Sequence, residues 1–367
     1  MSDEEREMNH KAIIAMSGGV DSSVAAFLMK QQGFECIGVT MKLFQNEDIG
    51  LRQKHTCCSL EDVEDARSVA DALDIPYYVF NFTANFKENV IDRFICAYEN
   101  GMTPNPCIDC NRHLKFDKLY RRAKELQYDY VVTGHYARIE RDARSGRYLL
   151  KKAADDSKDQ SYVLYAMSQD QLAHTQFPLG NMIKTEIRSI AEAQGFVNAR
   201  KHDSQDICFV QQESYADFIE RQSGRTYPEG DFIDTAGHIL GRHRGVIRYT
   251  VGQRKGLGVS SSEPLFVCEI HPEDNTVVLG KDEALYSRCL TASSINLISI
   301  PRIEKPMRLK AKIRYRQVEQ WAAVTQTDED TLKVEFDTPQ RAITKGQAVV
   351  LYDDDTVVGG GTITTCG

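Results

Sequence analysis

Short apolar runs alternate with amphipathic segments through the N-terminal half of the chain. The runs with the composition of buried strands cover residues 12–16, 36–41, 76–80 and 130–133. Helical spacing covers residues 24–32, 59–73, 86–100 and 184–194, and a further helix is expected after Asn111. Because strands and helices alternate and the strands are apolar throughout, this half predicts an α/β doubly wound parallel sheet. Its ligand is expected beyond the carboxyl ends of the strands.

The C-terminal half of the chain has a different pattern. A polar hairpin over residues 138–150 is expected to lie over the sheet. Beyond roughly Glu213, glycines become frequent and the apolar residues come in short runs bounded by turn signals. From Thr276 onwards strands dominate, and we expect a small linking domain followed by an all-β barrel. The expected domains cover residues 1–212, 213–280 and 281–367.

The first apolar run and the first amphipathic segment are joined by Ala-Met-Ser-Gly-Gly-Val-Asp-Ser-Ser, residues 15–23. Gly18 and Gly19 let the backbone approach a ligand without interference from a Cβ atom. The following helix presents unpaired N–H groups and the positive end of its dipole, so an anion is expected, and the hydroxyls of Ser17, Ser22 and Ser23 add donors. The alternative is a strand-to-helix turn without a ligand.

This loop is not the Gly-x-x-x-x-Gly-Lys-Ser loop, because no lysine follows the glycines. Its Ser-Gly-Gly-x-Asp-Ser sequence instead resembles the PP-loop of enzymes that cleave ATP to AMP and pyrophosphate. The resemblance implies a HUP-like ATPase domain.

Composition limits the compartment and the possible partners. The hydrophobic fraction of 41% and the charged fraction of 27% are those of a soluble globular protein, and no apolar run is long enough to span a bilayer. The polar, mostly acidic start of the chain argues against a secretory signal, so a cytoplasmic protein with no membrane partner is expected. The ten cysteines should then be thiols at rest. With a net charge of −8, nucleic acid would have to bind at local basic patches.

Cys107 and Cys110 form a C-x-x-C unit at a rigid turn that leads into a helix, where the dipole stabilises thiolates. Such a unit is a redox pair, half of a zinc site or part of an iron–sulfur site. A zinc ribbon needs a second C-x-x-C, which adjacent Cys57 and Cys58 do not supply. Cys208, between a polar segment and an apolar strand end, is a further functional candidate, although a buried structural cysteine is the alternative.

Two stretches of the chain are locally basic. Between Arg302 and Arg316 there are seven basic residues and one acidic residue, and apolar and basic positions alternate as in a strand with one charged face. Between His238 and Lys255 there are five Lys and Arg residues and no acid. Two such stretches in an acidic chain favour contact with an RNA backbone over a merely solvated strand face.

A set of motifs makes a family resemblance specific. In chain order they are Ala-Met-Ser-Gly-Gly-Val-Asp-Ser, Thr-Pro-Asn-Pro-Cys-x-x-Cys-Asn, Thr-Gly-His-Tyr-Ala, Lys-Asp-Gln-Ser-Tyr, Asp-Ser-Gln-x-Ile-Cys-Phe and Ile-Arg-Tyr-Arg. This order resembles that of the tRNA-specific 2-thiouridylase family, over nearly the whole chain. Other PP-loop enzymes share only the first motif.

The resemblance implies roles for individual residues. The implied contacts of ATP, with Mg²⁺, are Ala15, Met16, Ser17, Gly18, Gly19, Val20, Asp21, Ser22, Met41 and Gly134. Cys110 is implied as the nucleophile and Cys208 as the carrier of sulfur in a persulfide. The implied contacts of the target base are Asn105, Pro106 and Cys107. The implied contacts elsewhere on tRNA are His135, Lys158, Asp159, Gln160, Arg314, Tyr315 and Gln347.

The implied reaction is the ATP-dependent 2-thiolation of the wobble uridine of tRNA. Adenylation turns the C2 oxygen into a leaving group, and the persulfide on Cys208 supplies sulfur. A Cys110–Cys208 disulfide remains, which an external reductant must open. An upstream persulfide donor, either a cysteine desulfurase or a sulfur relay protein, is therefore an expected partner.

Three alternatives stay open. Cys107 stands where some members of the family carry an acidic residue, so the role of that carboxylate is unassigned, and Cys107, Cys110 and Cys208 are also a possible ligand set for a [4Fe–4S] cluster. A PP-loop ligase that transfers nitrogen is a second possibility, but it would leave Cys110 and Cys208 without a function. A metal-stabilised RNA-binding protein without catalysis is the third.

Overall fold

The computed structural model describes residues 10–44, 60–202, 207–210 and 213–366. By their contacts these residues belong to two compact units. One unit holds Met1–Val90, Cys107–Gln212 and Asp355–Val357, and the other holds Ile91–Pro106, Glu213–Asp354 and Val358–Gly367. Within the described ranges, no helix has the length and apolar character needed to cross a membrane.

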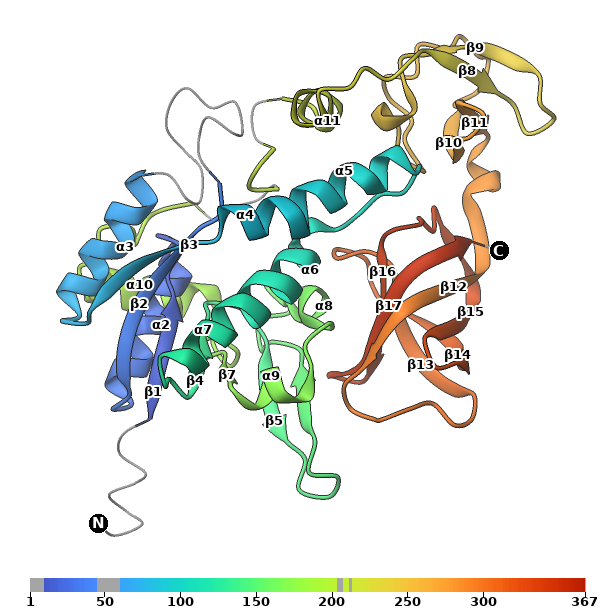
Figure 1. Cartoon of the computed structure of the whole chain (residues 1–367). Coiled ribbons are helices and arrows are strands. Elements are labelled where there is room, and N and C mark those ends of the chain that lie inside the picture. The colour runs from blue at the N-terminus through green and yellow to red at the C-terminus, as the bar shows by residue number, and fades with distance from the viewer. Residues whose placement is uncertain (1–9, 45–59, 203–206, 211–212, 367) are drawn as a thin grey trace. The chain divides into compact units, whose positions relative to one another are not determined.

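The first unit is built on a parallel sheet (Figure 1). Its strands are β1 (Lys11–Ala15), β2 (Glu35–Lys42), β3 (Tyr77–Asn81), β4 (Tyr130–Val132) and β7 (Thr175–Gln176). Their order is β3-β2-β1-β4-β7, and every neighbouring pair is parallel. The predicted doubly wound sheet is confirmed, with its topological switch point between β1 and β4.

Helices cover both faces of this sheet, which explains why its central strands are apolar throughout. Ala12 and Ile14 of β1 pack in a core with α2 (Val20–Gln31), α3 (Leu60–Ala72) and α10 (Lys184–Ala193). Ile13, on the opposite side of the strand, packs against α7 (Leu119–Glu125). Two short helices, α8 (Ser161–Leu164) and α9 (Gln169–Ala173), were not predicted.

The helix expected after Asn111 begins earlier, at Pro106. Proline is favoured in a first helical turn because the N–H that it lacks would be unpaired there anyway. The continuous segments are α6 (Pro106–Cys110), the π-helical η2 (Asn111–Lys118) and α7. The helix expected over 86–100 also begins earlier and consists of α4 (Thr83–Phe86), the π-helical η1 (Lys87–Ile91) and α5 (Asp92–Glu99).

The polar hairpin of β5 (Arg138–Arg141) and β6 (Tyr148–Lys151) does form. Its strands do not pair with the parallel sheet: Lys151 pairs with Thr356, at the start of β17 (Thr356–Cys366), and Arg138 donates to the carboxylate of Asp355 at 2.7 Å. A partner strand more than two hundred residues away in sequence therefore fixes the hairpin, which the sequence did not predict.

The second unit contains two β structures, as the glycine-rich pattern predicts. The smaller sheet has the order β10-β11-β8-β9 and is accompanied by α11 (Tyr215–Ser223) and the short 3₁₀ turns η3 (Val246–Arg248) and η4 (Asp282–Leu285). Its strands are β8 (Gly230–Ile233), β9 (Ile239–His243), β10 (Phe266–His271) and β11 (Thr276–Gly280).

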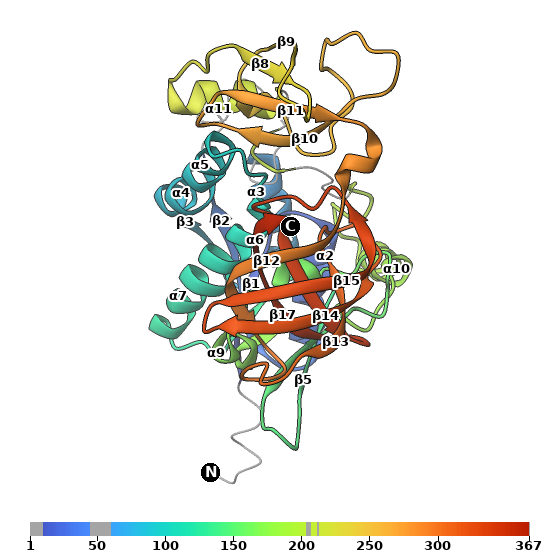
Figure 2. The same ribbon diagram turned by 90° about the vertical axis from the view of Figure 1, so that its right-hand side faces the viewer.

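The larger sheet of this unit is a closed antiparallel barrel (Figure 2). The order is β12-β15-β14-β13-β16-β17, and β12 also pairs with β17. The remaining strands are β12 (Tyr286–Leu297), β13 (Met307–Lys312), β14 (Gln320–Asp328), β15 (Thr331–Arg341) and β16 (Ala348–Asp353). Its buried core includes Leu309, Ala322, Val334, Leu351 and Ile363. The predicted barrel is confirmed.

Candidate active site

The PP-loop joins β1 to α2 at the carboxyl edge of the parallel sheet. Gly18 has φ +75°, and a Cβ atom there would lie 2.4 Å from the backbone oxygen of Asp62, so only glycine fits. Gly19 is the N-cap of α2 and has no side chain to cap the first N–H groups of the helix. A Cβ atom at Gly19 would meet nothing nearer than Ser17 Oγ, at 3.5 Å. The structure thus leaves space and donors for a phosphate beside Gly19.

Two of the three serine hydroxyls expected to add donors, those of Ser22 and Ser23, have a different role. Ser22 and Ser23 donate to the carbonyl oxygen of Gly19 at 3.0 and 3.1 Å, so they brace the loop instead of pointing to a ligand. Asn198, which sequence analysis missed, donates from Nδ2 to Gly18 O at 3.0 Å and to Ser23 Oγ at 2.9 Å. Asn198 is 2% exposed and fixes the conformation of the loop from a distant part of the chain.

Asp21 is the acidic residue of the loop and has two partners that the sequence did not reveal. Lys184 Nζ lies 2.7 Å from Oδ1 and 2.8 Å from Oδ2, and the hydroxyl of Tyr136 donates to Oδ1 at 2.6 Å. Tyr136 belongs to the Thr-Gly-His-Tyr-Ala motif, which is the only sequence signal for this pairing. The three side chains form a charged cluster beside the first turn of α2.

The other two residues implied in ATP binding lie at the same edge of the sheet. Gly134 follows β4, and a Cβ atom there would lie 2.8 Å from both the Asp21 carbonyl carbon and the Ser22 nitrogen. The end of β4 therefore packs directly against the PP-loop. Met41 is half-buried near the end of β2, where neighbouring Thr40 donates to the carbonyl oxygen of Met16 at 2.6 Å.

The C-x-x-C unit lies in the first turns of a helix. Cys107 is the second residue of α6 and is exposed, whereas Cys110 is the fifth and is half-buried. Asn111 is 3% exposed and donates from Nδ2 to Val163 O at 3.1 Å, which fixes the helix just beyond Cys110. The predicted place of the two cysteines at the start of a helix is confirmed for Cys107, whereas Cys110 is the last residue of α6.

Cys208 is placed in a short turn of the first unit and is half-buried. Its neighbour Phe209 is 2% exposed and packs edge-on against Phe86, with 5.6 Å between ring centroids. Phe209 therefore anchors the turn, while the Cys208 side chain is only half-buried. Residues 203–206 of the polar approach lie outside the described residues, as do Cys57 and Cys58.

Three cysteines outside these motifs have raised pKa values. Burial raises the pKa of the Cys36 thiol to about 11. Burial also raises the pKa values of Cys268 and Cys366. Such thiols are poor nucleophiles at neutral pH.

His135, an implied tRNA contact, is buried in the first unit. Its Nδ1 lies 2.7 Å from Thr133 Oγ1 and its Nε2 lies 3.5 Å from Lys115 Nζ. Burial, and then the charge of Lys115, hold the pKa of His135 well below its usual range, so the imidazole is neutral.

The residues 158–160, also implied in tRNA contact, connect to the PP-loop. Lys158 is half-buried, and Asp159 accepts from the backbone N–H groups of Ala153 and Ser161. Gln160 Oε1 accepts from the backbone N–H of Tyr136 at 2.9 Å, and the Tyr136 hydroxyl in turn bonds Asp21. Gln160 thus helps to hold Tyr136, and through it Asp21 of the PP-loop, in place.

In the second unit, two implied tRNA contacts, Gln347 and Arg314, hold neighbouring segments by hydrogen bonds. Gln347 Nε2 donates to the carbonyl oxygens of Thr103 at 2.8 Å and Pro104 at 3.2 Å, directly before Asn105 and Pro106. Arg314 donates to Ala342 O at 2.9 Å and Thr344 Oγ1 at 3.0 Å, in the turn that leads to Gln347. Tyr315 is half-buried beside Arg314.

The predicted alternation of the basic strand is confirmed in β13, where Leu309 and Ala311 are buried and the basic residues face outwards. Arg308 bonds both carboxylate oxygens of Asp337, at 3.0 and 2.5 Å, and its guanidinium lies 5.2 Å from the Trp321 ring centre. Lys310 Nζ lies 3.7 Å from a carboxylate oxygen of Glu319. Part of this positive charge is therefore compensated within the barrel.

The chain matches three family profiles in succession. They are described as the tRNA methyl transferase HUP domain, over residues 10–212, the tRNA methyl transferase PRC-barrel domain, over 216–281, and the aminomethyltransferase beta-barrel domain, over 287–363. The tRNA-specific 2-thiouridylase MnmA of Clostridioides difficile (strain 630) is 53% identical over 356 residues, which cover 97% of this chain and 98% of that protein. The chain belongs to the tRNA-specific 2-thiouridylase MnmA family.

Other relatives agree with this membership of the MnmA family. The protein named tRNA-specific 2-thiouridylase MnmA 1 of Thermoanaerobacter sp. (strain X514) is 51% identical, over 97% of this chain and 98% of that protein. Among solved structures, a 4-thiouridine synthetase–RNA complex with bound ATP is a distant match, with 19% identity and a TM-score of 0.37 over 58% of this chain and 50% of that one.

One group of side chains in this MnmA-family chain has the spacing of a metal site. Within the described ranges, the group of three whose ligand atoms all lie within 4.8 Å of one another is His271, Glu273 and Asp274, and it lies near the surface. Cys107, Cys110 and Cys208 do not form such a group in that part of the chain.

Proposed function

We propose that this protein uses ATP to replace the C2 oxygen of the wobble uridine of tRNA with sulfur. The observation that carries the proposal is the pairing, in one unit, of an open phosphate cradle at Gly19 with the helix of Cys107 and Cys110 and the half-buried Cys208. The phosphate cradle binds the ATP that activates the C2 oxygen of uridine, and the cysteines supply the sulfur. The family to which the chain belongs supports the choice of substrate.

The PP-loop supplies the adenylation step. Uncapped N–H groups at the start of α2 hold phosphate oxygens, and the space beside Gly19 admits them. Attack of the uridine C2 oxygen on the α-phosphorus releases pyrophosphate. We assign Mg²⁺ to the carboxylate of Asp21, which would have to exchange its contacts with Lys184 for the metal ion; the ion would offset the charge of the leaving pyrophosphate.

The cysteines supply the sulfur step. The Cys110 thiolate attacks the sulfur of Cys208 that carries the persulfide, forms the Cys110–Cys208 disulfide and releases hydrosulfide. Hydrosulfide then adds to C2 of the adenylated uridine and expels AMP. In an alternative route the persulfide itself adds to C2, and Cys110 resolves the resulting linkage with the same products. Either route leaves the two cysteines oxidised by two electrons, so a dithiol reductant must act once per turnover.

The partners follow from this chemistry. A cysteine desulfurase or a sulfur relay protein must recharge Cys208, and a reducing cytoplasm would keep the thiols available. We further propose that residues 1–212 carry catalysis, that 213–280 link the domains, and that 281–367 contact tRNA. The tRNA contacts would include Lys158 of the first range and Arg314 and Tyr315 of the third.

The direct test is a reconstituted reaction with tRNA, ATP and a persulfide donor. We expect one AMP and one pyrophosphate for each 2-thiouridine, measured by nucleotide analysis and by mass spectrometry of digested tRNA. Product formation from ammonia in place of the persulfide would favour the nitrogen-transferring ligase. Binding of tRNA without any release of pyrophosphate would favour a non-catalytic RNA-binding protein.

The role of an iron–sulfur cluster needs its own experiment. Protein purified without oxygen should be analysed for iron and sulfide, and then assayed after iron is removed. Multiple turnovers by the iron-free protein would support the persulfide route, whereas strict dependence on iron would support a cluster held by Cys107, Cys110 and Cys208.

A further inference from the structure

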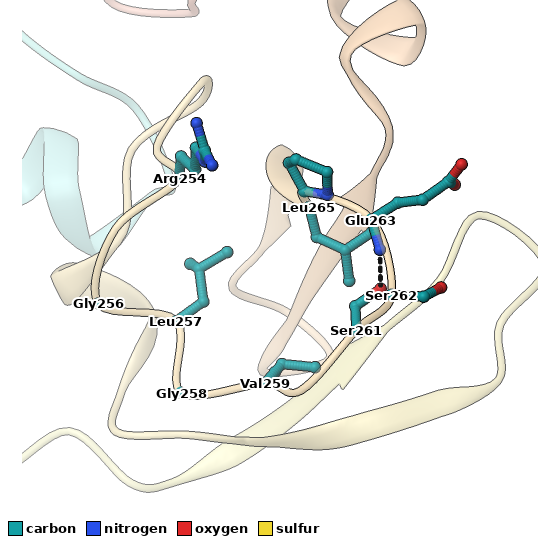
Figure 3. Close-up of a pocket in the computed structure, with 10 residues that line it drawn as sticks. Arg254, Gly256, Leu257, Gly258, Val259, Ser261, Ser262, Glu263 and Leu265 are labelled. Atoms are coloured by element: carbon teal, nitrogen blue, oxygen red, sulfur yellow. Dashed lines mark hydrogen bonds between the residues drawn. The ribbon is translucent and has the colours of Figure 1, made fainter.

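A surface cavity of about 420 Å³ lies in the second unit, between the two limbs of the loop that precedes β10 (Figure 3). Arg254 and Gly256 line the cavity from one limb, and Ser261 and Ser262 line it from the other. This cavity lies in the smaller β structure and includes none of the residues implied in catalysis.

The loop carries positive charge that the protein does not compensate. Of the basic residues between His238 and Lys255, Arg248 bonds Asp217 and Glu220 at 3.0 Å each, and Arg242 lies within 3.8 Å of a carboxylate oxygen of Glu229. Arg254 and Lys255 are exposed and make no ion pair with any described residue.

The acid nearest in sequence does not neutralise these cations. Glu263 lines the cavity but forms an ion pair with Lys281. Of the charged residues that line the cavity, Arg254 is therefore the one without an ion pair, and Lys255 follows it directly in the chain.

The backbone of the same loop supplies further donors. Gly256 and Gly258 have φ values of +79° and +70°, in the left-handed region. From Gly258 to Ser262, the N–H groups make no hydrogen bond to the backbone of any described residue. Successive N–H groups next to left-handed residues form concave sites for anions. The hydroxyls of Ser261 and Ser262 lie on the limb opposite Arg254.

We propose that this cavity binds a phosphate group of the tRNA backbone, with Arg254 and Lys255 supplying charge and the Gly258–Ser262 amides supplying directed hydrogen bonds. The inference rests on the proposed function, because it takes tRNA as the substrate. It adds a contact on the smaller β structure, outside the barrel and the catalytic unit. A free anion such as inorganic phosphate has the same chemistry, so the experiment separates the two sources.

The experiment compares tRNA binding by wild-type protein, Arg254→Ala, Lys255→Ala and the double variant, between about 50 and 200 mM salt. Each lost phosphate contact should lower the slope of log K against log salt by roughly 0.7 to 0.9 and weaken binding on the order of fivefold to eightfold at 0.1 M salt. Arg242→Ala removes the same charge from the same β structure, but its guanidinium already lies near carboxylates, so its slope should match the wild type.

A second measurement assigns the phosphate. Ethylation of single phosphates should reveal one position that interferes with binding of wild-type protein but no longer interferes with Arg254→Ala. Ser261→Ala should weaken binding with the slope unchanged, because a neutral hydroxyl releases no counterions. Titration with inorganic phosphate at constant ionic strength tests the free-anion source.

Unchanged slopes for Arg254→Ala and Lys255→Ala, in a protein that binds tRNA normally, would overturn this inference and leave the proposed function standing. Saturable binding of inorganic phosphate that Arg254→Ala removes, without any change in tRNA binding, would also overturn it. Failure of the wild-type protein to bind tRNA would contradict the proposed function itself.

Discussion

Lys184 Nζ lies 2.7 and 2.8 Å from the two carboxylate oxygens of Asp21, so the PP-loop carboxylate is held by the first residue of α10. The Lys184 side chain is 11% exposed, which strengthens the ion pair relative to one at the surface. The pair also brings an ammonium group next to the anion cradle at the start of α2.

We expect Lys184→Met to lower the rate of tRNA-dependent AMP formation by roughly 10- to 100-fold, because a hydrogen bond to a charged group contributes about 1.5–3 kcal/mol. Lys184→Arg, which keeps the charge, should retain part of the activity. Thermal unfolding monitored by circular dichroism controls for the fold. Full activity of Lys184→Met would restrict this residue to a structural role.

Two adjacent glycines give a matched pair of variants. Gly19→Ala should fold normally, because its Cβ atom has space, but it should bind ATP weakly since it occupies the phosphate cradle. Gly19→Val should abolish AMP formation for the same reason. Gly18→Ala should instead lower the free energy of unfolding, because its Cβ atom would lie 2.4 Å from Asp62 O. Isothermal titration with an ATP analogue and urea unfolding separate the effects; strong ATP binding by Gly19→Ala would contradict the assigned cradle.

Substitution of single cysteines should separate the adenylation step from the sulfur-transfer step. Cys208→Ser should form no 2-thiouridine but still release pyrophosphate in the presence of tRNA, because the PP-loop is untouched. Cys110→Ser should also fail to thiolate. Cys107→Ser should lower activity only in part, whereas loss of activity together with bound iron would indicate that Cys107 ligates a cluster. Thiolation by Cys208→Ser would refute the persulfide role.

Gln347 should act mainly through the segment that it holds. Gln347→Met keeps the length of the side chain but removes the bonds to Thr103 and Pro104, so kcat for thiolation should fall by roughly tenfold while the Kd for tRNA changes little. Gln320→Met is the control, since its side chain makes only a 3.4 Å bond to Val318 O. A large rise in Kd with an unchanged kcat would identify Gln347 as a direct tRNA contact instead.

His243 should make stability depend on pH. It is fully buried, with Nε2 3.0 Å from Asn275 O and Nδ1 accepting from the Gly245 N–H at 3.1 Å, and burial lowers its pKa. The unfolded chain therefore binds the proton more readily than the folded protein. The contribution of neutral His243 to the free energy of unfolding is present above pH 6.5. It is lost as the pH falls below that value, by up to about 1.4 kcal/mol per pH unit.

Urea unfolding at pH 8, 7, 6 and 5 measures this loss. His243→Gln should be less stable than wild type at pH 8 but should lose less stability on acidification. The pKa of buried His135 is lowered as well, but His135 is present in both proteins. The difference between the stability curves of wild type and His243→Gln therefore belongs to His243. Parallel curves would contradict the assignment.

By itself, the sequence determined the features that depend on neighbouring residues. Apolar runs identified four of the five strands of the parallel sheet but missed β7, Gly18 and Gly19 identified the phosphate loop, and alternation identified the outer face of β13. These features are set within a few residues, because backbone conformation and the periodicity of buried positions are local properties. The spacing of Cys107 and Cys110 belongs to the same class, although the true start of their helix, at Pro106, was misjudged by the weight given to Asn111.

Only the tertiary structure decided which distant side chains meet. Lys184 and Asp21 are 163 residues apart, Asn198 and Gly18 are 180 apart, and Gln347 and Thr103 are 244 apart. No local pattern marks such pairs, because each contact follows from how whole elements pack and not from the preferences of the two residues. The sequence therefore named the residues of the loop and the cysteines, while the fold determined the partners that orient Asp21, brace the loop and hold the segment before Cys107.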